Sequence, residues 1–230
     1  MISDDLGGPL TRVLRAISWA LFASALALLV WFFAQPELKD QELAGEQSRL
    51  VAEAVKELPA EALVTSQSAL GKLVPVAQVT QDGDVFAVLK IPRFGDDWQR
   101  FVGEGTRWET SLNTVGVGRY SNTSWPGEVG NFAVAGHRGG FGGSFRKINE
   151  LKAGDIAEVR TSDSLFTYRF IESAIVEPQE VGVIEQVPAV LSSAKAGGKY
   201  LTLTTCDPIW ENTHRFIAWF ELVSTEPLKP

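Results

Sequence analysis

The sequence predicts an all-β domain folded as a closed or nearly closed barrel, preceded by a transmembrane helix and a helical stalk. Three observations support this. Residues 16–34 form an uncharged apolar run, and a helical pattern follows them. From Val79 onward, short apolar segments alternate with turn residues. Many short strands at close spacing are typical of barrels.

Residues 16–34 are long enough to span a membrane. They consist mainly of Leu, Ala, Val, Phe and Trp, and about 20 such residues match the hydrocarbon core. Trp19 and Trp31 lie towards the two ends, where interfacial aromatic residues are common. We expect an uncleaved anchor. Cleavage as a signal peptide is the alternative, but a signal peptide usually has a shorter apolar region.

The charges that flank the anchor predict its orientation. Arg12 and Arg15 precede the span, whereas acidic residues surround the single Lys39 on the far side. The positive-inside rule then leaves residues 1–15 as a cytoplasmic tail and places everything after the anchor outside the cell. We therefore expect a single-pass protein of the plasma membrane with an extracytoplasmic domain.

Residues 35–78 are predicted to form a helical stalk or linker. Apolar residues between positions 43 and 58 fall on one face of a helical pattern, and Pro59 closes or kinks the helix. A helix that binds a partner is the alternative interpretation. The barrel domain is assigned to residues 79–230.

Six segments of this domain have the character of strands. They are rich in β-branched and aromatic residues, and Gly, Pro, Asp or Ser mark the turns between them. The segments are 85–91, 131–135, 156–160, 165–171, 200–205 and 216–223.

The charge balance and the absent motifs exclude several classes of function. The formal net charge is −7, whereas nucleic-acid binding calls for clustered Lys and Arg. The sequence has no His-Glu-x-x-His, no paired Cys-x-x-Cys and no phosphate-binding glycine loop. We therefore expect no nucleic-acid partner, no metal site and no cofactor.

Cys206 is the only cysteine of the chain. A single thiol forms no internal disulfide, and in an exported domain it fits a free reactive group. It ends the strand-like run 201–206, and a thiol nucleophile needs a proton donor and an oxyanion-binding group nearby. The alternative is a buried cysteine that acts as a small hydrophobe.

Two further residues complete the candidate catalytic set. His137 follows an apolar strand and lies among glycines, which let a substrate backbone approach, so it is the expected proton donor. Arg215 opens the strand after Cys206, and pairing of these strands would place the guanidinium beside the thiol, where it can hold an oxyanion. His214 is the rival histidine, and it ranks behind because a strand start is more often exposed.

These residues resemble the sortases, which are membrane-anchored cysteine transpeptidases of Gram-positive bacteria. The run Thr202–Cys206 resembles the TLxTC motif of the family, and the resemblance extends over roughly residues 84 to 224. The chain is most similar to the class E housekeeping enzymes of high-GC Gram-positive bacteria. The other matching segments are Ile91–Gly95, Gly118–Tyr120, Pro126–Asn131, Ala135–Arg138, Phe145 and Leu151–Asp155.

The resemblance implies an eight-stranded β-barrel with Cys206 and Arg215 on its last two strands and His137 as the acid–base residue. It also implies cleavage of a C-terminal LAxTG or LPxTG sorting signal between Thr and Gly, through a thioacyl intermediate. The acceptor would be an amine of a lipid-linked peptidoglycan precursor. The implied partners are surface proteins with such signals, this precursor and the membrane.

Tyr120, Thr204 and Thr205 are the expected substrate-binding residues. Tyr120 lies seventeen positions before His137, where class E sortases resemble one another in carrying a Tyr. By this resemblance its phenol could project into the groove for the second residue of the signal. Its oxygen could accept the backbone N–H of alanine, which proline lacks, and this would favour LAxTG. The alternative is that Tyr120 only packs on the barrel wall.

Three alternative functions stay open from the sequence. One is an exported thiol peptidase that hydrolyses its intermediate. Another is a pilin-polymerising sortase, but the Asp-Pro-aromatic lid of that class precedes the barrel, whereas Asp207–Trp210 here follows the cysteine. The last is a membrane-tethered binding module with an inert thiol.

Overall fold

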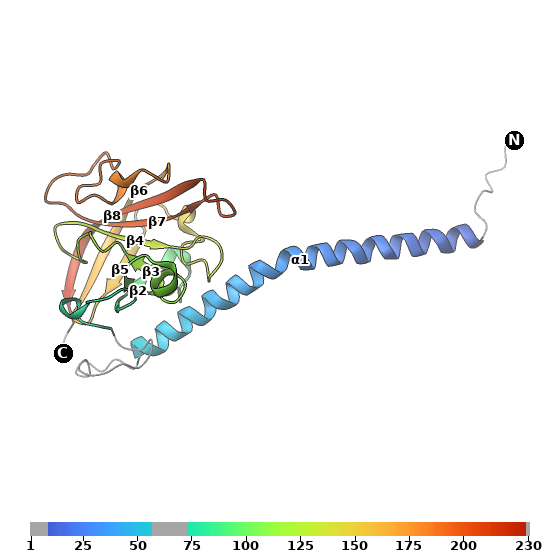
Figure 1. The fold of residues 1–230 in the computed structure, drawn as a ribbon, viewed down its shortest axis with the longest axis horizontal. Coiled ribbons are helices and arrows are strands. Elements are labelled where there is room, and N and C mark those ends of the chain that lie inside the picture. The colour runs from blue at the N-terminus through green and yellow to red at the C-terminus, as the bar shows by residue number, and fades with distance from the viewer. Residues whose placement is uncertain (1–8, 57–72, 229–230) are drawn as a thin grey trace. The chain divides into compact units, whose positions relative to one another are not determined.

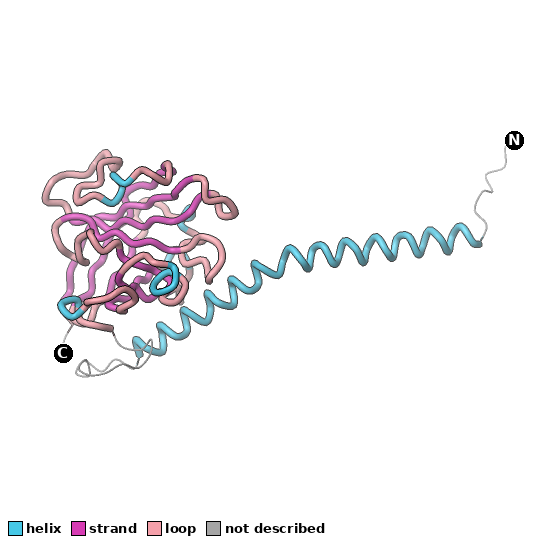
Figure 2. Tube along the Cα trace, in the orientation of Figure 1, coloured by secondary structure: helices cyan, strands magenta, loops and turns pink. Residues whose placement is uncertain are grey.

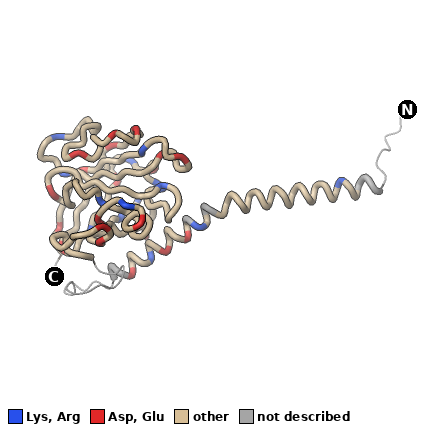
Figure 3. The backbone as a smooth tube through the Cα atoms, viewed as in Figure 1, with Lys and Arg blue, Asp and Glu red and all other residues tan. Residues whose placement is uncertain are grey.

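The structure is a computed structural model that describes residues 9–56 and 73–228. The chain divides into two compact units, Met1–Lys39 and Asp40–Pro230. Helix α1 (Pro9–Lys56) begins in the first unit. Its segment Val13–Gln35 is long and apolar enough to cross a membrane, by length and composition, and Figure 3 shows few charged residues along it. This segment includes the predicted anchor.

The second unit contains eight strands that close into a barrel (Figure 1). Around the barrel the order is β1-β2-β3-β4-β7-β8-β6-β5. The strands are β1 (Val85–Lys90), β2 (Gln99–Glu104), β3 (Gly116–Arg119), β4 (Gly130–Gly136), β5 (Ile156–Arg160), β6 (Ser164–Val176), β7 (Lys199–Asp207) and β8 (His214–Pro227).

Within residues 73–228, helix is confined to short turns before β1 and between strands (Figure 2). The turn Trp108–Leu112 (η3) is a π-helix. The 3₁₀ turns are η1 (Val76–Gln78), η2 (Pro92–Phe94), η4 (Ile148–Glu150) and η5 (Val181–Ile184).

The predicted eight-stranded barrel is confirmed, and its sheet is mixed. The pairs β2–β3 and β4–β7 are parallel, and the other neighbouring pairs are antiparallel. All six strands expected from the pattern are present, whereas β2 and β3 were not predicted. Both contain glycine, which strands usually disfavour. Gly118 is needed because a Cβ there would overlap the carbonyl oxygen of Gly105.

The two faces of β7 and β8 are buried in different clusters, and β4 joins them in the barrel core. Inward side chains form the barrel core and include Phe132, Val134, Leu201, Leu203, Ala218 and Phe220. Outward side chains pack against the segment around η5, and they include Tyr200, Ile217 and Trp219. Since side chains alternate along a strand, Cys206 lies on the outward face of β7.

The last part of α1 packs on the barrel, within the second unit. Val51 is buried in a small cluster with Leu73, and Arg100 Nη1 donates to Ser48 Oγ at 2.6 Å. Burial lowers the pKa of Arg100 to about 10. Of the predicted apolar face, Val51 is buried, whereas Leu43 and Leu50 are exposed. Pro59 and the rest of 57–72 lie outside the described residues.

Candidate active site

Cys206 and Arg215 lie opposite each other on neighbouring strands. They are register partners in the antiparallel pair β7–β8, and Cys206 is a half-buried free cysteine. The β7–β8 loop positions the guanidinium, because Arg215 Nη1 donates to the carbonyl oxygens of Asn212 at 3.1 Å and His214 at 2.8 Å. A guanidinium has five N–H donors, so it can bind a substrate oxygen as well.

His137 reaches the same end of the sheet through the parallel pair β4–β7. Ala135 is the register partner of Thr204, and Thr205 Oγ1 donates to the carbonyl oxygen of Gly136 at 2.7 Å. His137 directly follows Gly136, the last residue of β4, and Cys206 directly follows Thr205 in β7. The structure therefore brings the backbone positions of all three candidate catalytic residues together.

Asn113 orients the imidazole ring of His137. Its side-chain oxygen Oδ1 lies 2.8 Å from Nε2 of the histidine. An amide oxygen only accepts, so this contact calls for the tautomer that carries a hydrogen on Nε2. Trp108 and Phe141 flank the ring, with centroids at 5.9 Å and 5.2 Å. The sequence pattern did not predict these three neighbours.

His214 has a different environment from His137. Its side chain is 44% exposed, and Nε2 lies 3.5 Å from Glu177 Oε1. It is the register partner of Asp207 rather than of Cys206. Because Arg215 is its neighbour along β8, alternation directs His214 to the opposite face.

Tyr120 lies close to the outward face of β7, where its hydroxyl is 2.9 Å from Thr204 Oγ1. Burial is the largest effect on the pKa of the phenol and raises it. The Thr204 hydrogen bond and the Arg215 charge lower this pKa, and Cys206 raises it, so the net shift is upward. The phenol is therefore neutral at ordinary pH. It also lies within electrostatic reach of both Arg215 and Cys206.

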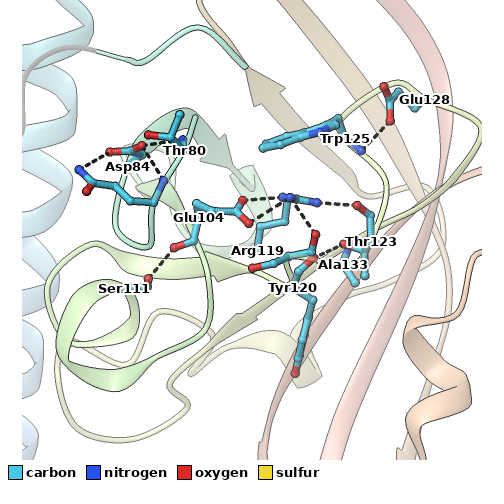
Figure 4. Close-up of polar contacts among 12 residues, drawn as sticks. Thr80, Asp84, Glu104, Ser111, Arg119, Tyr120, Thr123, Trp125, Glu128 and Ala133 are labelled. Carbon is cyan, nitrogen blue, oxygen red and sulfur yellow. Dashed lines mark hydrogen bonds and ion pairs between the residues drawn. The ribbon is translucent and has the colours of Figure 1, made fainter. Parts of the chain in front are cut away.

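An ion pair next to Tyr120 fixes the start of the β3–β4 connection (Figure 4). Arg119 Nε and Glu104 Oε2 are 2.7 Å apart, and both side chains are buried. The Arg119 guanidinium also covers the ring of Trp125 at 3.7 Å. Figure 4 shows the Tyr120 side chain extending away from this network. The pair thus anchors the backbone while the phenol is presented to β7.

The two predicted threonines differ in placement. Thr204 shares the outward face with Cys206 and contacts Tyr120. Thr205 is buried, and its hydroxyl is used in the bond to Gly136 that joins β7 to β4. Among the described residues, no group of three or more His, Cys, Asp or Glu side chains could hold a metal ion.

A comparison with protein families shows which family the chain belongs to. The model of the sortase domain family matches residues 89–223. The chain belongs to the sortase family. This confirms the resemblance inferred from the TLxTC-like run and its accompanying segments.

The similar sortases include class E members from Streptomyces. Sortase E from Streptomyces avermitilis is 42% identical, with a TM-score of 0.59 over 64% of this chain and 93% of that chain. Sortase E1 from Streptomyces coelicolor, with a tripeptide in its active site, is 36% identical, with a TM-score of 0.60 over 63% of this chain and 91% of that chain.

The curated relatives are longer than the matched region. Sortase SrtE1 of Streptomyces coelicolor is 36% identical over 153 residues, which cover 64% of this chain and 43% of the relative. The chain thus matches less than half the length of that protein. Sortase D of Bacillus subtilis is 28% identical over 188 residues, covering 82% of this chain and 87% of the relative.

Proposed function

We propose that this protein is a membrane-anchored cysteine transpeptidase that cleaves LAxTG- or LPxTG-type sorting signals and transfers the protein to a cell-wall precursor. The observation that carries the proposal is the convergence of Cys206, Arg215 and His137 at one end of β4, β7 and β8. Membership of the sortase family supports it.

In the first half-reaction, the Cys206 thiolate attacks the carbonyl carbon of the signal's threonine. Arg215 stabilises the negative charge that develops on the carbonyl oxygen. His137 then donates the proton on Nδ1 to the glycine nitrogen as the C–N bond breaks. The leaving peptide departs as a neutral amine, and the threonine stays attached to Cys206 as a thioester.

In the second half-reaction, an amine replaces the departed glycine. It attacks the thioester carbonyl, and Nδ1 of His137 takes a proton from the attacking nitrogen. The Cys206 thiolate leaves, and a new amide bond joins the threonine to the acceptor. Asn113 supports both steps by the same contact, because it holds Nε2 as a donor while Nδ1 moves the proton.

The direct test is product analysis with a sorting-signal peptide. The purified protein is incubated with an LAxTG or LPxTG peptide, with and without an amine acceptor of the kind found in peptidoglycan stems. We expect cleavage between Thr and Gly and formation of the amide product when the amine is present. Hydrolysed product alone, at any amine concentration, would favour the thiol peptidase. No cleavage and no alkylation of Cys206 would favour the binding module.

The membrane arrangement has its own test. The apolar segment Val13–Gln35 supports an anchor, and Arg12 and Arg15, which precede its uncharged part at residues 16–34, support a cytoplasmic N-terminus. A protease added to intact protoplasts should therefore degrade the barrel and leave the anchor region. Complete protection of the barrel would contradict this orientation.

A further inference from the structure

Arg138, Asp207 and Phe216 form a cluster, and each directly follows a proposed catalytic residue in the sequence. Side chains of neighbouring residues on a strand point to opposite faces, and Phe216 packs against the barrel core. The cluster therefore lies on the inner side of the sheet, behind the face that carries His137 and Cys206.

Arg138 connects the ends of three strands. Its Nη1 forms an ion pair with Asp207 Oδ1, and the two side chains are only 11% and 16% exposed. The guanidinium carbon lies 5.3 Å from the ring centroid of Phe216. Its Nη2 donates to Asn149 Oδ1 at 3.2 Å. An ion pair that is shielded from water couples its partners more strongly than a surface pair does.

The segments beyond this ion pair also run close together. A Cβ atom on Gly139 would lie 2.9 Å from the carbonyl oxygen of Ile209. The loop after His137 and the loop after Cys206 therefore pass at a separation that only glycine allows. The ion pair fixes the two backbones immediately before this contact.

We propose that Arg138 and Asp207 are positioning residues that set the distance and orientation of His137 relative to Cys206. This proposal rests on the proposed function, because the proton transfer requires that alignment. Neither side chain needs to touch the substrate, since each acts through the residue before it in the sequence. Small displacements of reacting groups are costly: about 1 Å can reduce turnover roughly 100-fold.

Removing one member of the pair leaves the charge of the other member uncompensated, and Asp207 is the residue next to Cys206 in the sequence. A nearby carboxylate disfavours a thiolate, whereas a nearby guanidinium favours it. The thiol has Arg215 as its register partner and Tyr120 within electrostatic reach, His137 follows the neighbouring strand β4, and His214 lies opposite Asp207 across the β7–β8 pair. These groups are unchanged when only one member of the ion pair is removed. Removing the guanidinium and removing the carboxylate should thus have opposite effects on the thiolate population.

The experiment uses the full-length protein with single substitutions Arg138→Met and Asp207→Asn and the double variant. Two quantities are measured: kcat/KM for a sorting-signal peptide, and the rate of Cys206 alkylation as a function of pH. Both single variants should lose about tenfold or more in kcat/KM. The pH midpoint of alkylation should rise in Arg138→Met and fall in Asp207→Asn. The double variant should return to the natural midpoint while its activity stays low.

Arg93 and Asp155 supply the matched control. They form an ion pair with a 2.7 Å Nη2–Oδ1 contact, which joins η2 to the turn before β5. Arg93→Met and Asp155→Asn should leave both kcat/KM and the alkylation midpoint unchanged. Arg138→Lys keeps the charge but loses the planar fork, so it should keep the natural midpoint and lose part of the activity.

Some outcomes would overturn the positioning role. One is a shift of the midpoint in the same direction in both single variants. Another is natural kcat/KM in both, with thermal unfolding measured to show that each variant is folded. If the natural protein cleaves no sorting-signal peptide, the proposed function fails. The opposite midpoint shifts would then still report on the ion pair, so the two failures are distinguishable.

Discussion

The two histidines of this chain lie near the same end of the sheet, at the end of β4 and at the start of β8, and their surroundings differ. His137 has its Nε2 held by Asn113 and its ring flanked by Trp108 and Phe141. His214 is 44% exposed and lies 3.5 Å from Glu177, a carboxylate that is itself 72% exposed. The difference favours His137 as the proposed acid–base residue, because its ring is pre-organised, although His214 is closer in sequence to Cys206.

Alanine substitutions test this comparison most strongly. Cys206→Ala and His137→Ala should each reduce kcat/KM by roughly 10³-fold or more, because they remove the nucleophile and the proton carrier. His214→Ala should stay within about twofold of the natural protein, since an exposed ion pair contributes little. The measurement is chromatography of cleaved LAxTG peptide. A fully active His137→Ala variant would transfer the role to His214 and reverse the comparison.

Arg215, the register partner of Cys206, can be compared with an exposed arginine. Arg215→Ala should lower kcat/KM by about 10²- to 10³-fold, as expected for loss of an oxyanion donor. Arg215→Lys should recover only part of this, because an ammonium lacks the fork geometry. Arg107, which is 73% exposed and 3.8 Å from Asp82, is the matched control, and Arg107→Ala should keep full activity. Equal rates for Arg215→Ala and Arg107→Ala would exclude an oxyanion role.

Asn113 sharpens the comparison, because its contact with His137 is one that His214 lacks among the described hydrogen bonds. Asn113→Ala should lower kcat by about 10- to 100-fold through misorientation of His137. Asn113→Asp keeps an acceptor for Nε2 and adds a charge that favours the imidazolium, so activity should return and extend to higher pH. Thr114→Ala, which removes a bond to the Thr110 carbonyl in the same loop, is the control. If Thr114→Ala causes the same loss as Asn113→Ala, the effect belongs to the loop rather than to the contact.

The sequence predicted the barrel and the three candidate catalytic residues because short-range patterns mark them. Cys206 ends an apolar run, and His137 follows another. The structure then places Gly136 and Thr205, their predecessors, in direct contact. The pairing of β4 with β7 therefore brings together two residues that the sequence pattern marks separately.

Other features depend on contacts that no local pattern encodes. Asn113 lies after an isolated π-helical turn and meets His137 only through tertiary packing. Strands β2 and β3 contain glycines, which in a sequence pattern indicate turns. Gly118 is needed for another reason, because the carbonyl of Gly105 leaves no room for a Cβ atom there. The packed face of α1 is set by the barrel surface that it meets, and Val51 is buried there while Leu50 is exposed.

Substitution of Tyr120 has the smallest expected effect. It concerns the preference of the site for LAxTG over LPxTG signals. Its neutral hydroxyl contacts Thr204 at 2.9 Å, and a phenol oxygen has further bonding capacity beyond that contact. This capacity can take the backbone N–H of alanine at the second position of the signal, where proline has no N–H. One net hydrogen bond of about 0.5–1.5 kcal/mol corresponds to roughly a 2- to 10-fold preference for LAxTG.

The test compares kcat/KM for matched LAxTG and LPxTG peptides in the natural protein, Tyr120→Phe and Thr204→Val. Tyr120→Phe removes the hydroxyl but keeps the ring, so it should lose the preference while both peptides are still cleaved. Thr204→Val keeps the phenol and removes only its present partner, so the preference for LAxTG should persist. If the two peptides react alike in all three proteins, Tyr120 serves only to pack against β7, and selectivity for the second residue arises elsewhere in the groove.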